Sequence, residues 1–338
     1  MTRLYVGLEH ALLVIDPEHP APLQPLLTDH TIQAIAADPL HPERVYVAAY
    51  DGLWVTTDAG SSWRDLSNTL PNPHAMALAV SALERCDDQG AVFLGTEPSA
   101  VYRSDDGGRV WREEGQSLTT LPSATTWSFP PRPDTHHVRW IGLDPVDAAR
   151  RYICIEAGAL AYSTDSGIHY RDRVPGGPLD THTFAVHPQA PGRLYAASGE
   201  WRTPGYYESR DHGETWEQPV AGLLHPYLLG LAVDSADPDR VLVSAAANAI
   251  QGNRPAQAEA HVYLREGNAA WVEVAGLPTA RSVCHILVAH PTRGGSFYAL
   301  SNLGLFQTMD GGHAWEQVPL TWRDEFAAMQ ARALLVTA

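Results

Sequence analysis

Histidines recur at the entrances to the strand-like segments of this 338-residue chain, where an apolar run begins after a turn. The chain holds 16 histidines, so their return at equivalent places departs from chance. Neutral imidazoles that converge on one axis are typical ligands of a transition metal. The sequence therefore predicts an axial site for a divalent transition metal of unassigned identity, with ligands among His30, His74, His137, His182, His225 and His285.

Carboxylates and arginines lie near the same places and could supply acid–base chemistry and anion binding. Glu97 and Glu200 follow strand-like segments and have no evident duty in a turn, so we predict that one of them is the general base. Arg139 and Arg332 are expected in the same channel, where a guanidinium group would match a carboxylate or phosphate. The predicted catalytic set is therefore Glu200, Glu97, Arg139 and Arg332.

A structural explanation competes with this chemical one. Polar residues around a channel can hold ordered water and satisfy the backbone groups at strand ends. Asp51 and Glu156 also stand at second-strand ends, but Asp51-Gly52 and the run EAG at 156–158 are typical of ordinary turns. Both explanations stay open at the level of sequence.

The elements that must position these side chains are marked by an eight-residue motif that occurs five times. Each copy has a hydroxyl residue first, aspartate third, glycine fifth and an aromatic residue eighth. Side-chain oxygens can cap the free N–H groups of a tight turn, glycine takes the positive φ, and the aromatic ring packs beneath. The motif predicts a hairpin turn held by side chains at residues 56–63, 104–111, 163–170, 209–216 and 308–315.

This motif resembles the Asp-box, or BNR, repeat S/T-x-D-x-G-x-T-W of β-propellers such as sialidases, sortilin-type receptors and a photosystem assembly factor. The run SRDHGETW at 209–216 matches it at every defined position. The resemblance implies a propeller of the sialidase-like and sortilin-like superfamily, with each box on the outer hairpin of a blade and away from the ligand face. The box aspartates would then be structural, since fold and function are separate questions.

Seven repeat units can be laid out along the chain. The segment from Arg3 to Leu27 supplies only part of a unit, and the apolar run from Arg332 to Thr337 is a candidate for the strand that it lacks. We therefore predict an all-β, seven-bladed β-propeller that forms one domain over residues 1–338 and is closed by pairing of its N- and C-terminal strands. The complete units are expected to begin near Thr31, Ala75, Val138, Thr181, Tyr227 and Ser282.

Composition limits the cellular compartment and the classes of binding partner that we expect for this protein. A formal charge of −16 disfavours nucleic acid and anionic membranes as partners. No apolar run is long enough to span a membrane, and the opening residues lack the pattern of a secretion signal. Cys86, Cys154 and Cys284 are widely spaced in apolar settings, which suits reduced, buried thiols. These features predict a cytoplasmic protein and leave its oligomeric state open.

Two functions from different classes remain. The first is an enzyme whose His- and Arg-lined site on the upper face acts on a small or sugar-like anionic substrate. The second is a propeller without catalysis that binds a protein or peptide there, with an exposed apolar patch near Trp127, Trp201 and Tyr207. A sialidase-type glycoside hydrolase is disfavoured, because the Phe/Tyr-Arg-Ile-Pro motif of that family is missing from the sequence.

Overall fold

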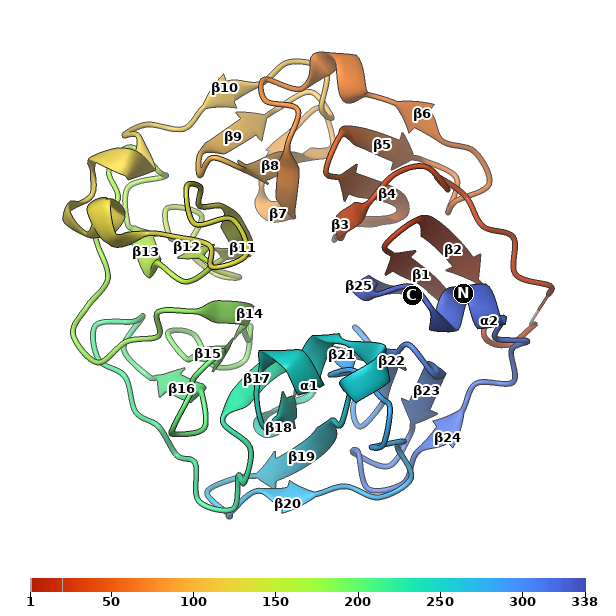
Figure 1. Cartoon of the computed structure of the whole chain (residues 1–338). Helices are drawn as coiled ribbons and strands as arrows, with labels where there is room; N and C mark the ends of the chain where they lie inside the picture. Colours follow the sequence, from red (N-terminus) through yellow and green to blue (C-terminus); the bar gives the residue numbers. More distant parts are fainter. Residues whose placement is uncertain (1, 20) are drawn as a thin grey trace. The chain divides into compact units, whose positions relative to one another are not determined.

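The chain folds as an all-β protein, with seven antiparallel sheets that are the blades of a β-propeller (Figure 1). The computed structural model describes residues 2–19 and 21–338. Within these residues there are two short α-helices, α1 (Ala249–Asn253) and α2 (Asp324–Ala327). The prediction of an all-β, seven-bladed propeller is confirmed.

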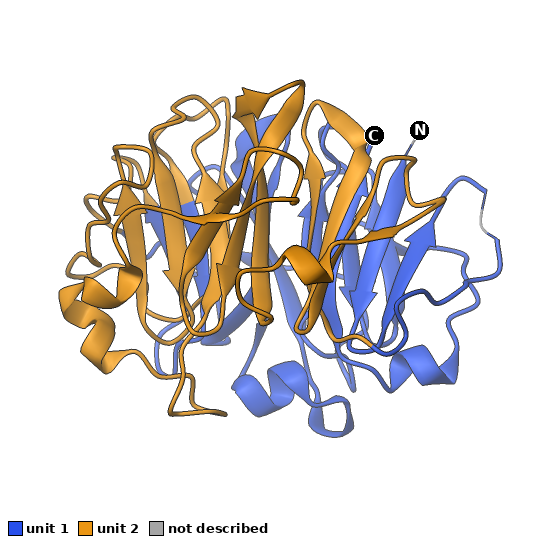
Figure 2. Ribbon diagram, turned by 90° about the horizontal axis from the view of Figure 1, so that it is seen from above, with its two compact units in different colours: residues 1–29, 195–208, 217–338 blue, residues 30–194, 209–216 orange. Residues whose placement is uncertain are grey.

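The chain divides into two compact units, coloured separately in Figure 2. Unit 1 comprises residues 1–29, 195–208 and 217–338, and unit 2 comprises residues 30–194 and 209–216. Three sheets belong to each unit. The strands of the remaining sheet, in the order β14-β15-β16, fall at the boundary of the two residue ranges: β14 (Thr181–Val186), β15 (Leu194–Ser198) and β16 (Tyr206–Ser209).

Unit 2 is built from three consecutive antiparallel meanders. The second strand of each is a nearly continuous apolar run, because it is covered on both faces and loses the alternation of a half-exposed strand. In β4, for example, all five residues from Val45 to Ala49 are buried. The strands are β3 (Ile32–Asp38), β4 (His41–Ala49), β5 (Gly52–Thr56), β6 (Arg64–Asp65), β7 (Ala75–Cys86), β8 (Gln89–Thr96), β9 (Val101–Ser104), β10 (Arg112–Glu113), β11 (Val138–Leu143), β12 (Arg151–Ile155) and β13 (Ala159–Ser163).

Unit 1 contains the two ends of the chain and two further four-stranded sheets. Its strands are β1 (Arg3–Leu8), β2 (Ala11–Ile15), β17 (Tyr227–Asp234), β18 (Asp237–Ala246), β19 (His261–Glu266), β20 (Val272–Glu273), β21 (Ile286–Ala289), β22 (Phe297–Ser301), β23 (Gly304–Thr308), β24 (Glu316–Gln317) and β25 (Ala331–Thr337). The C-terminal strand β25 pairs antiparallel with β1, with Arg3 opposite Thr337. The predicted pairing of the terminal strands is therefore confirmed.

Five of the six predicted unit starts fall within one residue of a strand, and the sixth differs. Strand β21 begins at Ile286, four residues after the predicted start at Ser282. The intervening backbone is bonded outside the ladder, since the Val283 N–H donates to the Asn302 side chain and the Cys284 N–H donates to the Gly252 carbonyl. These bonds replace the strand pairing that the apolar sequence suggested.

The five motif copies form the same hydrogen-bonded turn. In the copy at 209–216 the Ser209 hydroxyl donates to Asp211 at 2.8 Å and accepts from the Gly213 N–H at 2.8 Å, while Asp211 accepts from the Thr215 N–H at 2.9 Å. The glycine takes a positive φ of 90°. Equivalent bonds occur in the copies at 56–63, 104–111, 163–170 and 308–315.

Two further predictions, on the burial of the cysteines and on membrane-spanning segments, can be compared with the structure. Cys154 and Cys284 are buried as expected, but Cys86 is exposed at the end of β7, so the prediction for that thiol was wrong. None of the helices formed by residues 2–19 and 21–338 combines the length and apolar character needed to cross a membrane.

Candidate functional site

The candidate site begins where strands β11 and β12 of unit 2 meet. His137 immediately precedes β11, and Glu156 immediately follows β12. These strands pair antiparallel with Val138 opposite Ile155, so the two flanking residues lie side by side. The Glu156 N–H accordingly donates to the His137 carbonyl at 3.3 Å. Strand register therefore fixes the first imidazole beside the first carboxylate.

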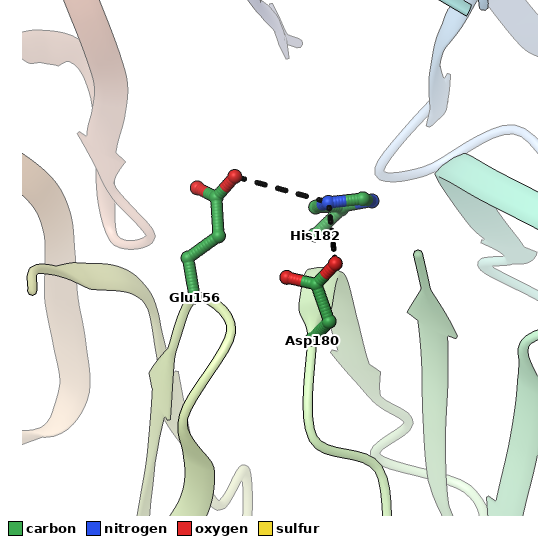
Figure 3. Close-up of side chains that lie close together, drawn as sticks. All are labelled: Glu156, Asp180 and His182. Carbon is green, nitrogen blue, oxygen red and sulfur yellow. Dashed lines mark ion pairs between the residues drawn. The ribbon is translucent and has the colours of Figure 1, made fainter. Parts of the chain in front are cut away.

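Asp180 and His182 add a second carboxylate and a second imidazole from the start of β14. They flank Thr181, and residues two apart in an extended chain point to the same side. Asp180 Oδ1 accepts the Ala157 N–H at 2.8 Å, which ties the segment before β14 to the turn after β12. Figure 3 shows the resulting approach of Glu156, Asp180 and His182.

The two oxygens of Glu156 have different partners. Oε2 lies 2.8 Å from His137 Nε2 and 3.5 Å from Arg139 Nε, whereas Oε1 lies 3.8 Å from His182 Nε2. Asp180 Oδ2 lies 3.6 Å from the same His182 nitrogen (Figure 3). Each carboxylate is thus held by one oxygen and directs the other toward His182.

Electrostatics keeps Glu156 ionised. Burial raises the pKa of its carboxyl, but the hydrogen bond with His137 and the charges of Arg139 and His182 outweigh burial and lower the pKa to about 2. The Glu156 side chain is 17% exposed to solvent. At neutral pH Glu156 therefore serves as a negative ligand or hydrogen-bond acceptor and cannot donate a proton.

The donor set could hold a metal ion. Single ligand atoms of Glu156, Asp180 and His182 all lie within 4.8 Å of one another. Two ligands of one tetrahedral ion are about 3.3 to 3.6 Å apart at ordinary bond lengths. His182 Nε2 lies 3.6 Å from Asp180 Oδ2 and 3.8 Å from Glu156 Oε1, so these two separations need only small inward shifts. Two oxygens and one imidazole nitrogen suit divalent zinc, manganese or iron.

A third carboxylate, Glu97, adjoins the His137 imidazole on the side opposite Glu156. Glu97 lies immediately after β8, and its side chain is only 5% exposed. Its Oε2 lies 2.5 Å from Arg132 and 3.5 Å from His137 Nδ1. The Tyr50 hydroxyl donates to Oε1 at 3.5 Å. His137 therefore lies between two carboxylates, one on each ring nitrogen.

The other predicted residues of unit 2 lie close to aromatic and acidic partners. His30 Nδ1 lies 3.0 Å from Asp51, so the residue interpreted as a turn also pairs with a predicted ligand. The His74 ring stacks on Tyr50 at 4.2 Å between centroids. Among the predicted residues of this unit, the structure brings His137, His182 and Arg139 together at Glu156, with Glu97 beside them.

The predicted residues of unit 1 have separate surroundings. His225 stacks on His261 at 4.1 Å and lies 2.7 Å from the Tyr263 hydroxyl. His285 is fully buried, with Nε2 3.5 Å from the Ser282 hydroxyl. Glu200 accepts from the Tyr207 hydroxyl at 2.9 Å, and Arg332 lies 4.0 Å from Glu9. These residues stay predictions as ligands or catalysts.

Sequence reasoning missed three members of this arrangement. Glu156 was interpreted as a turn residue, and Asp180 and Arg132 were not singled out. The Asp-Thr-His order at 180–182 was an available signal, because it places a carboxylate and an imidazole on one side of a strand. Arg132 lies in a loop, where no periodicity reports on its contacts.

The expected apolar patch is not formed as predicted. Trp127 is 6% exposed and packs in a core cluster with Phe93 and Tyr170, and Tyr207 is 8% exposed. Trp201 is 91% exposed. Of the three aromatic residues, Trp127 and Tyr207 are therefore buried and only Trp201 is exposed.

Comparisons with known proteins place the chain among β-propellers. No protein-family model matches it. The chain is 25% identical over 260 residues to the xyloglucanase Xgh74A of Acetivibrio thermocellus, in an alignment that covers 63% of the chain and 29% of that relative. The chain thus spans less than a third of the length of the curated relative that it matches.

Solved structures give the same class of fold. A GH74 enzyme of Niastella koreensis superposes with a TM-score of 0.70 at 17% identity, covering 93% of this chain and 52% of the other. YCF48 of Cyanidioschyzon merolae superposes with a TM-score of 0.63 at 14% identity, covering 92% and 96%. A structure of YCF48 bound to D1 peptide gives a TM-score of 0.58 at 17% identity, covering 85% and 81%. At these identities the likeness establishes the fold alone.

Proposed function

We propose that this protein is a metal-binding propeller of the Asp-box type, with a divalent cation held by Glu156, Asp180 and His182. The observation that carries this proposal is that the two oxygens of each carboxylate have different partners. One oxygen of Glu156 is held by His137 and Arg139, one oxygen of Asp180 is held by a backbone N–H, and the other oxygens face His182 Nε2. Such outer partners orient ligands in metal sites.

The ligand of this site would be a small anionic or sugar-like molecule. The Arg139 side chain is 23% exposed, lies beside Glu156, and offers a fork of donors to a carboxylate or phosphate. A bound cation would supply Lewis acidity to an oxygen of the same ligand. If the site is catalytic, Glu97 would act as general base through His137, which contacts both carboxylates.

Titration calorimetry with zinc or manganese chloride tests the cation site. We expect one ion per chain in the native protein and at least a tenfold weaker affinity in Glu156→Gln and Asp180→Asn, because each removes a negative ligand. Glu259→Gln is a matched control: His261 also has two carboxylates, but Glu273 and Glu259 lie on opposite ring nitrogens, at 2.6 and 4.0 Å, and cannot share one ion. Binding that is absent in the native protein, or lost equally in the control, would refute the proposal.

Peptide binding is the second candidate function. It is favoured by the superposition on YCF48, which covers 96% of that chain, whereas the GH74 enzyme is matched over only 52% of its length. One YCF48 structure is of a complex with D1 peptide. A peptide partner should bind equally well with and without a chelator, and loss of peptide binding in a chelator would favour the metal-dependent function instead.

The substrate of the site and the cellular compartment of the protein need separate arguments. Hydrolysis of xyloglucan follows only from the weak match to a xyloglucanase, and an assay for reducing sugar released from xyloglucan decides it. The free thiols of Cys86, Cys154 and Cys284 support the cytoplasmic location that we propose.

A further inference from the structure

Arg132 occupies a position in unit 2 that an external cation could fill. Its guanidinium carbon lies 5.7 Å from the centre of the Tyr50 ring and 5.1 Å from that of Phe129, so two aromatic faces flank the charge. Its Nη2 bonds to Glu97 at 2.5 Å. Two rings and one carboxylate around a guanidinium group form the arrangement that selects planar cations.

Glu97 requires a positive partner, because its carboxylate is only 5% exposed. A buried charge without a partner costs several kcal/mol. The cation that bonds to Glu97 at 2.5 Å comes from an exposed loop, and the Arg132 side chain itself is 47% exposed. The permanent part of the site is therefore the buried carboxylate, and the exposed part is the arginine.

The loop that carries Arg132 is held mainly by its own bonds. The Arg132 N–H donates to the Phe129 carbonyl at 2.7 Å, the Phe129 N–H donates to the Thr135 carbonyl at 2.9 Å, and the Ser128 hydroxyl donates to the Pro133 carbonyl at 3.1 Å. Arginine has a long side chain with several rotatable bonds. A change of side-chain rotamer can therefore withdraw the guanidinium group while the loop keeps its fold.

We propose that Glu97, Tyr50 and Phe129 form a binding site for a guanidinium group, and that Arg132 is an internal occupant which a ligand displaces. The ligand is either an arginine side chain of a peptide or a small molecule that carries the same group. A formal charge of −16 favours the approach of such cations. This site adjoins the proposed cation site through His137 but differs from it in its binding atoms, because it uses Glu97 and not the oxygens that face His182.

Arg132→Ala is the direct test, since it empties the site and leaves the exposed loop otherwise unchanged. We expect this variant to bind agmatine or methylguanidinium about tenfold more tightly than the native protein, in which Arg132 competes for the carboxylate. Methylguanidinium should also raise the melting temperature of the variant, because it restores a guanidinium partner to Glu97 beside the Tyr50 hydroxyl and His137. Calorimetry is carried out with a chelator, so that failure of the metal proposal does not affect the result.

Four controls sharpen this test. Methylurea has the same shape without the charge and should not bind. Arg112→Ala removes another exposed arginine of unit 2, one paired with Asp105, and should behave like the native protein. Glu97→Gln in the Arg132→Ala background should abolish binding. Phe129→Leu in the same background should weaken binding, and it replaces the Glu97 variant as the test if that variant does not fold.

The source of the guanidinium group is resolved by comparing probes. Tighter binding of a blocked tripeptide with a central arginine than of agmatine identifies a protein segment as the partner, and the reverse order identifies a small molecule. The proposal is overturned if Arg132→Ala binds none of these probes more tightly than the native protein does, or if it binds methylurea equally well.

Discussion

His285 shows at the scale of one residue that burial can explain a histidine without any ligand. Its side chain is fully buried, and burial lowers its pKa from 6.5 to about 3. The ring therefore stays neutral in the folded protein across the physiological range. Its surroundings favour a structural role beside the Ser282 hydroxyl, although the sequence pattern grouped it with candidate ligands.

This burial predicts a specific loss of stability in acid. The folded pKa lies below the unfolded value, so the unfolded chain binds the proton first, and the contribution of His285 is complete above pH 6.5 and is lost as the pH falls toward 3. Between pH 7 and pH 5 the native protein should lose about 2 kcal/mol more unfolding free energy than His285→Leu. Urea titrations at both pH values measure the difference, and parallel losses in the two proteins would contradict it.

Residue types could be predicted at the site, but their partners could not. His137, His182 and Arg139 were found because each stands at a fixed place relative to a strand. Glu156 and Asp180 acquire their role only when the turn after β12 meets the segment before β14, a contact that is not encoded by either segment alone. Local sequence therefore singled out these two imidazoles as candidates and left Glu156 and Asp180 unassigned.

The motif turns show at the scale of elements what local sequence does determine. The capping bonds of the first hydroxyl residue and the third-position aspartate close within eight residues, so spacing alone predicted the geometry of these caps. Arg132, by contrast, bonds to Glu97, 35 residues earlier in the chain, and no local pattern announces that contact. Elements with short-range bonds were predictable, and loops whose partners are distant were not.

The motif at 308–315 allows its cap and its aromatic ring to be compared. Trp315 is 8% exposed, lies in a core cluster, and donates to the Gly312 carbonyl at 2.9 Å. Trp315→Ala should lower the unfolding free energy by about 3 to 5 kcal/mol, as expected for a buried aromatic. Asp310→Ala should cost about 1 kcal/mol through the lost cap.

Trp201→Ala supplies the control for these variants, because its ring is 91% exposed. That change should alter stability by less than about 0.5 kcal/mol. Urea denaturation compares the three variants directly. Equal effects of the Trp315 and Trp201 substitutions would show that the motif ring does not support the fold.

The chain ends determine, at the scale of the whole molecule, how the first blade is completed. Strand β25 supplies the neighbour that β1 lacks in the N-terminal segment, and its Leu334 and Val336 pack in a cluster with Leu4, Val6 and Phe326. This pairing was predicted because the first repeat unit lacks one strand, and the apolar run at the C-terminal end belongs to no other unit. Global arrangement was predictable here from the count of repeats.

Deletion of residues 332–338 should therefore expose the edge of β1 and remove two large buried side chains. We expect a loss of more than about 4 kcal/mol in unfolding free energy, together with a tendency to aggregate through the open edge. Removal of the exposed Ala338 alone is the control and should have little effect. A truncated protein that melts at the native temperature would show that β25 is dispensable.

Anomalous X-ray scattering from crystals of the zinc-loaded protein tests the central claim most directly. The account predicts one strong peak about 2.0 to 2.3 Å from Glu156 Oε1, Asp180 Oδ2 and His182 Nε2. The peak should vanish in Asp180→Asn crystals grown and loaded in the same way. Zinc bound only at other residues, or no peak near His182 at full loading, would contradict the proposed cation site.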